Sequence, residues 1–390
     1  MKTSSARIQG LGTTIFAEMS ALAARTNAIN LGQGFPDTDG PGFVIEAAVD
    51  ALHNGHNQYA PGTGIAPLRQ AIADHQRRFY GLELAPDTEV AVTTGATEAV
   101  AAALLSLIDP GDEIIVLEPY YDSYVAGIQF AGGVRKPVTL RAPDFRPNLD
   151  ELRAAVTSRT TAILLNSPHN PTGTVLTRDE LAAIADVAIE RDLVVISDEV
   201  YEHLTFDAHR HIPIATLPGM AERTLTISSG GKSFSFTGWK IGWATGPAPL
   251  IDALLASKQF LTYTSGSPLQ PAIAAALGAD DAYFAEFTRQ MTAQRDQLCD
   301  GLREIGFDVF VPAGTYFATT DIRPLGFDDG VEFCRTLPER AGVAAIPHQV
   351  FYDDVDAGRP LVRWAFCKRP EVIAEALRRL KTLPDLGRSC

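Results

Sequence analysis

The sequence predicts an α/β protein with a large domain on a mostly parallel sheet and a smaller α+β domain. From about residue 90, short apolar runs rich in β-formers alternate with stretches whose apolar residues recur at helical spacing. After about residue 280 a long amphipathic stretch, short β-rich runs and a second helical stretch replace this alternation. Strands that alternate with helices predict a parallel sheet covered on both faces.

In the first part, residues 89–95 (EVAVTTG) predict a strand, and the alanine-rich residues 96–108 predict the helix that follows it. Residues 177–192 have apolar residues at helical spacing, with Thr177 as the expected N-cap. Four further strands, each apolar with few charges, are expected at 112–119, 160–168, 193–201 and 224–230.

In the last part, residues 284–306 predict a long amphipathic helix and residues 370–383 a closing one, with short strands within 307–322 and 361–369. The first forty residues contain their own Gly/Pro-rich turn, NLGQGFPDTDGP, and are expected to pack on the small domain or across an interface. The predicted division is 1–40 as an N-terminal arm and part of the small domain, 41–283 as the large domain, and 284–390 as the small C-terminal domain.

The charge distribution excludes some function classes. The net charge is −14 and no Lys/Arg cluster occurs, which argues against nucleic acid or an anionic membrane as the main partner. The first twenty residues lack the continuous apolar run of a signal peptide. The most apolar run, 99–108, is too short to span a bilayer.

Neither cysteines nor histidines show metal-binding spacing. His209 and His211 form the only close pair of the His-x-His type, in a loop-like stretch without a nearby cysteine, and we expect two solvated imidazoles and no metal. The widely spaced cysteines are expected to be reduced thiols of a cytoplasmic protein: Cys299, Cys334, Cys367 and Cys390.

The unusual side chains follow the predicted strands directly. Active sites of open α/β sheets lie at the carboxyl ends of the strands, in the loops that follow. The segments that fit this rule are 95–97, 118–121, 166–173, 198–201 and 228–232.

Lys232 follows Gly230 and Gly231, which let a ligand approach the backbone closely. A lysine in a dry pocket or beside other cations has a lowered pKa and becomes nucleophilic towards carbonyl groups. The alternative, a solvated lysine at a strand end, is the more common state of an isolated lysine.

Asp198 ends a buried strand, where a carboxylate needs a cation or several donors. A protonated pyridine nitrogen is one such cation, and a helix N-cap or a structural ion pair is the alternative. Tyr201 can place its hydroxyl on the same ligand, and Tyr121 offers a flat ring for stacking, although both also fit ordinary core packing.

Two loops add possible contacts to the same ligand. Residues 166–173 contain two X-Pro bonds, which can hold Asn170 rigidly. Gly95, Ala96 and Thr97 lie between a strand and a helix, where backbone amides and the helix N-terminus form a phosphate site. Each signal is weak alone, because many strand–helix connections contain glycine and proline.

Together the residues describe one ligand, pyridoxal 5′-phosphate, which needs a lysine and an acidic partner for its ring nitrogen. The acidic partner keeps the nitrogen protonated, so that the ring accepts electrons from a substrate carbanion. The matched groups are an aldehyde for Lys232, a pyridinium for Asp198, a phenolate oxygen for Asn170 and Tyr201, and a phosphate for residues 95–97 and Ser229.

Three motifs carry a family resemblance: NPTG (170–173), SDEVY (197–201) and SSGGKSFSFTGWKIGW (228–243). With them the chain resembles, over nearly its whole length, the class I/II aminotransferases of pyridoxal phosphate fold type I. NLGQGFPD, NQY, SPHNPTG and TGWKIGW are most similar to the branch with kynurenine/glutamine, methionine and actinobacterial N-succinyldiaminopimelate aminotransferases. The resemblance implies a seven-stranded sheet in a cofactor-binding domain 41–283, and a homodimer with shared active sites.

The resemblance also implies roles for individual residues. Lys232, Asp198 and Tyr201 would be catalytic: Lys232 would bond covalently to the cofactor and then move a proton, Asp198 would pair with the ring nitrogen, and Tyr201 with the ring oxygen. Arg363 would clamp the substrate α-carboxylate, with Gly34 and Asn170 in the same pocket. Further cofactor contacts would come from Asn170, Gly95, Ala96, Thr97, Tyr121, Ser229 and Lys240, and from Tyr59 of the partner copy.

Two positions depart from the wider superfamily. Lys240 stands where many members have arginine, and a lysine cannot make the planar fork of a guanidinium. Tyr121 replaces a phenylalanine or tryptophan, so its hydroxyl needs a partner.

The predicted reaction is a ping-pong transfer of an amino group between an amino acid and a 2-oxo acid. The resemblance favours N-succinyl-LL-2,6-diaminopimelate with glutamate, as in lysine biosynthesis, ahead of a broad kynurenine, glutamine or methionine specificity. A cysteine-S-conjugate β-lyase is a further alternative. A non-catalytic sensor domain is disfavoured because Arg363 is kept and no N-terminal DNA-binding extension is present. Aromatic residues that can line the substrate pocket are Tyr121, Tyr124, Phe35, Tyr263, Phe351 and Tyr352.

Overall fold

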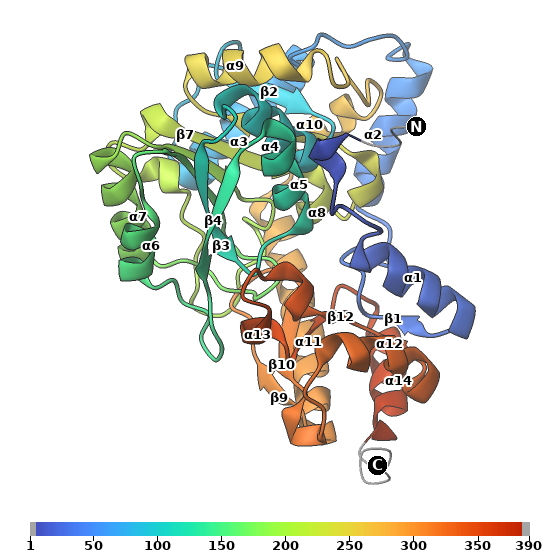
Figure 1. The fold of residues 1–390 in the computed structure, drawn as a ribbon. Helices are drawn as coiled ribbons and strands as arrows, with labels where there is room; N and C mark the ends of the chain where they lie inside the picture. The colour runs from blue at the N-terminus through green and yellow to red at the C-terminus, as the bar shows by residue number, and fades with distance from the viewer. Residues whose placement is uncertain (1–4, 384–390) are drawn as a thin grey trace.

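The computed structural model describes residues 5–383, and its centre is a seven-stranded sheet of order β2-β8-β7-β6-β5-β3-β4 (Figure 1). The strand β8 is antiparallel to both of its neighbours, and all other pairs are parallel. The predicted mostly parallel, seven-stranded sheet is therefore confirmed. The strands are β2 (Val90–Thr93), β3 (Glu113–Glu118), β4 (Val134–Thr139), β5 (Thr160–Asn166), β6 (Val194–Asp198), β7 (Thr224–Ser229) and β8 (Gly242–Thr245).

Helices cover both faces of this sheet (Figure 1). Ile114 and Val116 of β3 pack with α4 (Gly95–Leu107), α5 (Asp122–Ala131) and α9 (Ala248–Lys258). Ile115 and Leu117, one residue along, pack on the other face with α6 (Leu149–Ala155) and α7 (Arg178–Glu190). Because both sets of alternate side chains are buried, the strands read as continuous apolar runs.

Further helices cover the end of the sheet at β2 and β8, where Val92 and Trp243 join a third core cluster. These helices are α2 (Gly42–His53), α3 (Ala66–Tyr80) and α10 (Gln270–Leu277). The helix α7 begins as predicted, since Thr177 and Glu180 form a reciprocal capping box at its N-terminus.

A smaller, antiparallel sheet has the order β12-β13-β10-β9. Its strands are β9 (Asp308–Phe310), β10 (Phe317–Asp321), β12 (Ile346–Pro347) and β13 (Leu361–Ala365). The long helix α11 (Asp281–Ile305) leads into it and starts three residues before the predicted position, because Asp280 caps it. The other helices here are α12 (Gly330–Ala341), α13 (Val355–Gly358) and α14 (Pro370–Leu380).

The N-terminal segment packs on this smaller sheet region. In Figure 1 the blue helix α1 (Ile15–Thr26) lies beside the red C-terminal helices. The strand β1 (Ile29–Asn30) pairs in parallel with β11 (Val343–Ala344), and Leu31 donates to and accepts from the backbone of the C-terminal part. These contacts support the division into 1–40, 41–283 and 284–390, which we keep as a proposal.

In the part of the chain that the structure describes, no helix is long and apolar enough to cross a membrane. Cys299, Cys334 and Cys367 are buried and form no disulfide, and Cys390 lies outside the described residues. The expectation of two solvated imidazoles is wrong for His211. Its side chain is 3% exposed and its Nε2 lies 2.7 Å from Oε2 of Glu199, a buried carboxylate that needs a partner.

Candidate functional site

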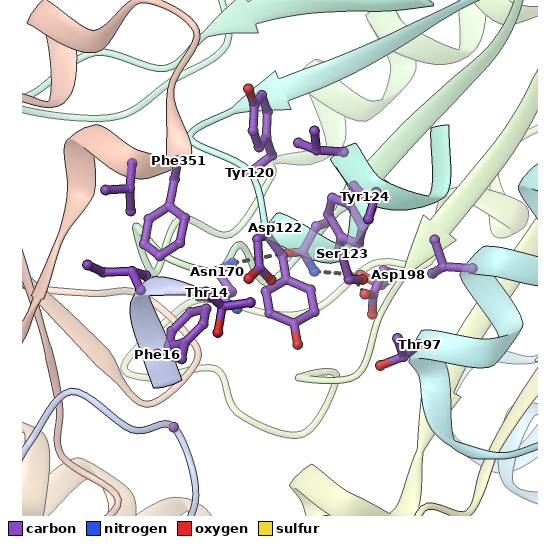
Figure 2. Close-up of a pocket in the computed structure, with 18 of the residues that line it drawn as sticks. Thr14, Phe16, Thr97, Tyr120, Asp122, Ser123, Tyr124, Asn170, Asp198 and Phe351 are labelled. Atoms are coloured by element: carbon purple, nitrogen blue, oxygen red, sulfur yellow. Dashed lines mark hydrogen bonds between the residues drawn. The ribbon is translucent and has the colours of Figure 1, made fainter. Parts of the chain in front are cut away.

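A cavity of about 1000 Å³ opens where the carboxyl ends of the parallel strands face the smaller sheet. Figure 2 shows Thr97 and Asp198 on one side of this space and Phe16 and Phe351 on the other, with Asn170 between them. All but one of the residues predicted to bind cofactor or substrate line this cavity: Gly34, Gly95, Ala96, Thr97, Tyr121, Asn170, Asp198, Tyr201, Ser229, Lys232, Lys240 and Arg363.

The exception is Tyr59, which is 84% exposed and contacts Tyr263 edge-on, at 5.8 Å between ring centroids. It does not line the cavity of its own chain. Of the predicted aromatic lining, Phe35 and Tyr263 also lie outside the cavity, whereas Tyr121, Tyr124, Phe351 and Tyr352 are part of it. The sequence identified candidate aromatic residues, but it did not indicate which of them lie on segments that face the strand ends.

Lys232 sits in α8 (Gly230–Ser233), a single turn that begins directly after β7. Its Nζ donates to the hydroxyl of Tyr316 at 2.9 Å, and that hydroxyl in turn donates to the carbonyl of Gly34. Burial lowers the pKa of Lys232 to about 8, and no carboxylate within the described residues forms an ion pair with it. Lys232 therefore provides a neutral, nucleophilic amine more readily than a surface lysine does.

Asp198 ends β6 and is buried. Burial raises the pKa of Asp198 to about 6, against the opposing effect of its hydrogen bonds. Its Oδ2 accepts from the Tyr124 hydroxyl at 2.6 Å and its Oδ1 from the Val200 N–H at 3.3 Å. Neither donor carries a charge, so a ligand cation beside Asp198 would favour the ionised form.

Arg363 projects from β13 and is almost fully buried, at 1% exposure. Its Nη1 donates to Oδ1 of Asn170 at 2.9 Å and its Nη2 to the Gly32 carbonyl at 2.8 Å, while its Nε has no partner. Burial lowers the pKa of Arg363 to about 10. Among the described residues no carboxylate pairs with this guanidinium, and such a buried cation favours an anionic ligand such as a carboxylate.

The turn from β2 into α4 has the form of a phosphate site. Gly95 adopts φ +71°, a left-handed conformation that glycine accepts without strain. The N–H groups of Ala96 and Thr97 lie in the first turn of α4, where they have no acceptor within the helix. A Cβ on Gly95 would lie 3.1 Å from Nζ of Lys240, so this amine lies over the same turn.

Close packing around this turn depends on Gly242. A Cβ there would lie 2.5 Å from the carbonyl carbon of Gly95, closer than atoms can approach. The second glycine of the motif TGWKIGW therefore lets β8 pass directly behind the turn from β2 into α4.

The sequence did not predict the partners that hold Lys232 and Asp198. Tyr316 precedes β10, 84 residues from Lys232, and no local pattern links the two positions. Tyr124 lies within the apolar helix α5, where its hydroxyl bonds to Asp198 from 74 residues away. Either contact could have been predicted only from knowledge of how the distant segments pack at the strand ends.

We expect covalent attachment of the cofactor to metal- and ligand-free protein to depend on pH through about 8. Attack on an aldehyde needs the unprotonated amine, and burial lowers the pKa of Lys232 to about 8 from 10.5. The attachment rate should rise with pH and level off above about 8, measured by stopped-flow absorbance after mixing with pyridoxal phosphate. A rate that rises steadily to pH 10 would show an ordinary lysine.

Comparison with known proteins adds independent findings. A family model described as aminotransferase class I and II matches residues 26–380. A probable N-succinyldiaminopimelate aminotransferase, DapC, of Mycobacterium tuberculosis is 54% identical over 390 residues, covering 97% of this chain and 98% of the relative. A methionine aminotransferase of Escherichia coli is 40% identical over 377 residues, covering 97% of both chains.

A solved structure of N-succinyldiaminopimelate aminotransferase from Mycobacterium tuberculosis superposes with a TM-score of 0.96 at 55% identity. The match covers 97% of this chain and 100% of that one. The fold predicted from the family resemblance is therefore confirmed, and with it the two-part α/β architecture that surrounds the cavity.

Proposed function

The chain belongs to the class I and II aminotransferases, which are pyridoxal 5′-phosphate-dependent transaminases, and on this premise we propose its active-site residues and its substrate. The proposed active site is the cavity around Lys232, Asp198 and Arg363. The observation that supports it best is that three buried ionisable side chains line one cavity without forming ion pairs within the described residues. They are a lysine with a lowered pKa, a carboxyl group with a raised pKa and an arginine without a described carboxylate partner.

The residues fit the cofactor group by group. When bound, pyridoxal phosphate supplies an aldehyde that condenses with amines and a protonated ring that accepts an electron pair. Asp198 would hold the proton on the ring nitrogen, and Asn170 and Tyr201 would contact the ring oxygen. Ser229, Lys240 and the amides of residues 96 and 97 would hold the phosphate, and Tyr121 would stack on the ring.

Lys232 would perform two tasks. It would hold the cofactor covalently between turnovers and, once an amino acid has displaced it, its free amine would take the proton from the substrate α-carbon. The Tyr316 hydroxyl, 2.9 Å from Nζ, keeps that amine in position between the strand end and the smaller sheet. The same amine would then deliver this proton on the cofactor side, after which water releases the 2-oxo acid. The reverse sequence with a second 2-oxo acid would complete the transfer of the amino group.

Arg363 would bind the substrate α-carboxylate. We expect Arg363→Lys to raise KM for the amino acid about 100-fold, because a lysine loses the two-pronged contact. The measurement is steady-state kinetics on folded, cofactor-loaded protein, with the exposed Arg359→Lys as the matched control. An Arg363→Lys enzyme with unchanged KM would contradict the assignment.

We propose N-succinyl-LL-2,6-diaminopimelate as the amino donor and 2-oxoglutarate as the acceptor. The support is the 54% identity to the Mycobacterium tuberculosis relative over nearly the whole of both chains. The cavity also agrees with a long donor that bears distal carboxylates. Arg135 and Arg335 also line it, in ion pairs with Asp353 and Glu18 respectively, and a ligand carboxylate could compete for either guanidinium.

A broad specificity for methionine, glutamine or kynurenine is the second candidate, favoured by the aromatic lining of Phe16, Tyr121, Tyr124 and Phe351. A screen of amino donors separates the two, following loss of the absorbance of the lysine-bound cofactor in single half-reactions. The proposal requires the succinylated donor to react fastest at equal concentration. Faster reaction of methionine or kynurenine would support the broad enzyme, and release of pyruvate and ammonia from cysteine conjugates would indicate β-lyase activity.

We further propose a homodimer in the cytoplasm. The support is Tyr59, which is 84% exposed and lies outside the cavity of its own chain. In a dimer Tyr59 would reach the phosphate of the partner's site. Light scattering coupled to size-exclusion chromatography measures the molar mass and so tests the dimer. The mass of a monomer at micromolar concentration would contradict it.

A further inference from the structure

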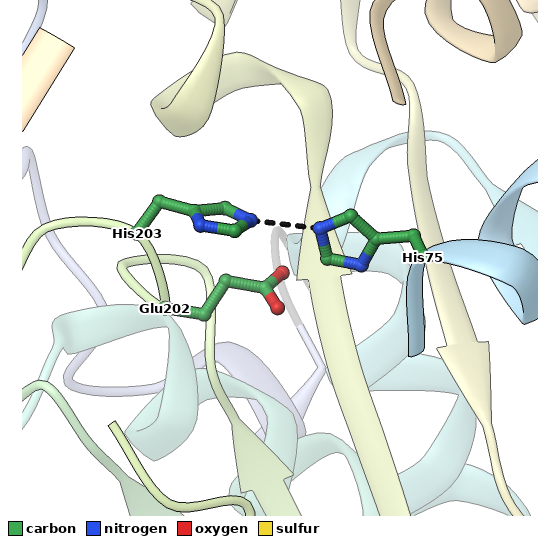
Figure 3. A group of neighbouring side chains, drawn as sticks. All are labelled: His75, Glu202 and His203. Atoms are coloured by element: carbon green, nitrogen blue, oxygen red, sulfur yellow. Dashed lines mark hydrogen bonds between the residues drawn. The ribbon is translucent and has the colours of Figure 1, made fainter. Parts of the chain in front are cut away.

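A second group of buried polar side chains lies outside the cavity, between α3 and the turn after β6. His75 of α3 points towards His203, and their Nε2 atoms lie 2.7 Å apart. Figure 3 shows the two rings tip to tip, with the carboxylate of Glu202 beside the gap. One ligand atom from each of the three residues lies within 4.8 Å of the others.

The charges of this region do not balance with the groups that the structure describes. Glu202 is 5% exposed and Glu199 1% exposed, and within residues 5–383 neither pairs with a lysine or an arginine. Their polar partners are hydroxyl groups and histidines. Two buried carboxylates without a lysine or arginine partner are costly unless another cation accompanies them.

His75 itself has unused bonding capacity. Its side chain is buried, at 3% exposure for the residue, and its Nδ1 has no hydrogen-bond partner. The contact between the two Nε2 atoms satisfies only one hydrogen bond and requires one ring to donate to the other. The two Nε2 atoms face each other with Glu202 beside them, and two imidazole nitrogens next to a buried carboxylate are the composition of a metal site.

We propose that His75, Glu202 and His203 bind one zinc ion, through two imidazole nitrogens and a carboxylate oxygen, with water as the fourth ligand. This set of two nitrogens and one oxygen suits zinc, which takes tetrahedral sites of this kind. Two nitrogens bound to one tetrahedral zinc lie about 3.4 Å apart, so the rings would separate by about 0.7 Å. Rotation of the two side chains accommodates that movement.

Neighbouring residues already orient the carboxylate. The Tyr80 hydroxyl donates to Oε2 of Glu202 at 2.8 Å, and the Ser228 hydroxyl donates to Oε1 at 2.5 Å. Each carboxylate oxygen keeps a second lone pair for a metal. Hydrogen bonds of this kind fix the direction in which a ligand presents its lone pair.

The consequence is mechanical. Zinc would join α3 to the turn that follows Asp198, a turn that includes the cavity-lining residue Tyr201. The zinc ligands themselves do not line the cavity. His75 and His203 both also pack on Phe284 of α11, so the ion would join three elements of the large sheet's surroundings. A zinc ion here would therefore stabilise the position of the cofactor-facing turn without entering the reaction.

The expectation of no metal site came from the spacing of histidines along the chain. His75 and His203 are 128 residues apart, so their proximity leaves no local pattern. The pair that the spacing singled out, at 209 and 211, contributes one imidazole to Glu199 instead.

The test uses untagged, cofactor-loaded protein, stripped of metal with a chelator and titrated with zinc chloride by calorimetry. We expect one zinc per chain and a rise in melting temperature on zinc addition. His75→Gln and His203→Gln should each bind about 100-fold more weakly or not at all, since each loses a ligand. The exposed His56→Gln is the matched control and should bind as the wild type does.

Cobalt(II) provides a second measurement on the wild-type protein, independent of whether the variants fold. Visible absorption bands of tetrahedral cobalt, displaced by zinc, support the site. The absence of any site in the wild-type protein would overturn the proposal. Zinc binding that His75→Gln and His203→Gln leave unchanged, in variants with wild-type circular dichroism, would also overturn it by locating the metal elsewhere.

Discussion

Replacement of Lys232 by alanine is expected to abolish transamination, lowering turnover by at least about 10⁴-fold. The change removes both the covalent tether of the cofactor and the amine that moves the proton. Among the described lysines only Lys232 donates to Tyr316, and the amine of Lys240 lies over the turn from β2 into α4. Turnover of the preferred donor is measured together with the absorbance of the lysine-bound cofactor.

Lys136→Ala is the control for removing a lysine elsewhere in the chain, because Lys136 of the edge strand β4 does not line the cavity. It should keep wild-type turnover. Appreciable transamination by Lys232→Ala would refute the assignment of Lys232 as the essential amine.

The second large effect is expected for Asp198→Asn. An amide cannot hold a proton on the ring nitrogen, so the ring accepts the substrate electron pair less well. We expect removal of the α-proton to slow about 10²- to 10⁴-fold, within the range for a positioned charged group. The measurement is exchange of the substrate α-proton in deuterated water, followed by proton NMR.

The fold should tolerate Asp198→Asn. Burial raises the pKa of Asp198 from 3.8 to about 6, so ionisation of this group costs folding free energy that sets in between these pH values and persists above pH 6. The amide removes that cost, and the melting temperature of the cofactor-free variant at pH 8 should equal or exceed that of the wild type. The exposed Asp186→Asn is the control for the exchange of the substrate α-proton and should exchange at the wild-type rate. An unchanged exchange rate in Asp198→Asn would show that the carboxylate does not act on the ring.

Much of the large domain was predictable because its strands carry a strong local signal. The apolar runs of β3, β5, β6 and β7 are buried on both faces, and burial on both faces requires such runs. The rule that sites form at strand ends then identified Lys232 and Asp198 before any contact was known. The strand β4 was not predicted, because Arg135, Lys136 and Pro137 give it the composition of an edge strand.

Contacts between distant segments were not predictable. Tyr316 reaches Lys232 and Tyr124 reaches Asp198 only after the smaller sheet and α5 have packed on the strand ends. The short strand β8 was also missed, since its four residues carry no periodicity and its position follows from Gly242 fitting against Gly95. Local pattern therefore located the polar side chains that line the cavity, and tertiary packing determined their partners.

The most direct test of the account is to find which residue carries the cofactor. Reduction of the loaded enzyme with borohydride fixes the bond between the lysine and pyridoxal phosphate, and mass spectrometry of the digested protein locates it. The account predicts the added mass on the peptide that contains Lys232 and on no other. Label on Lys240 or Lys258 instead, or no covalent label at all, would contradict it.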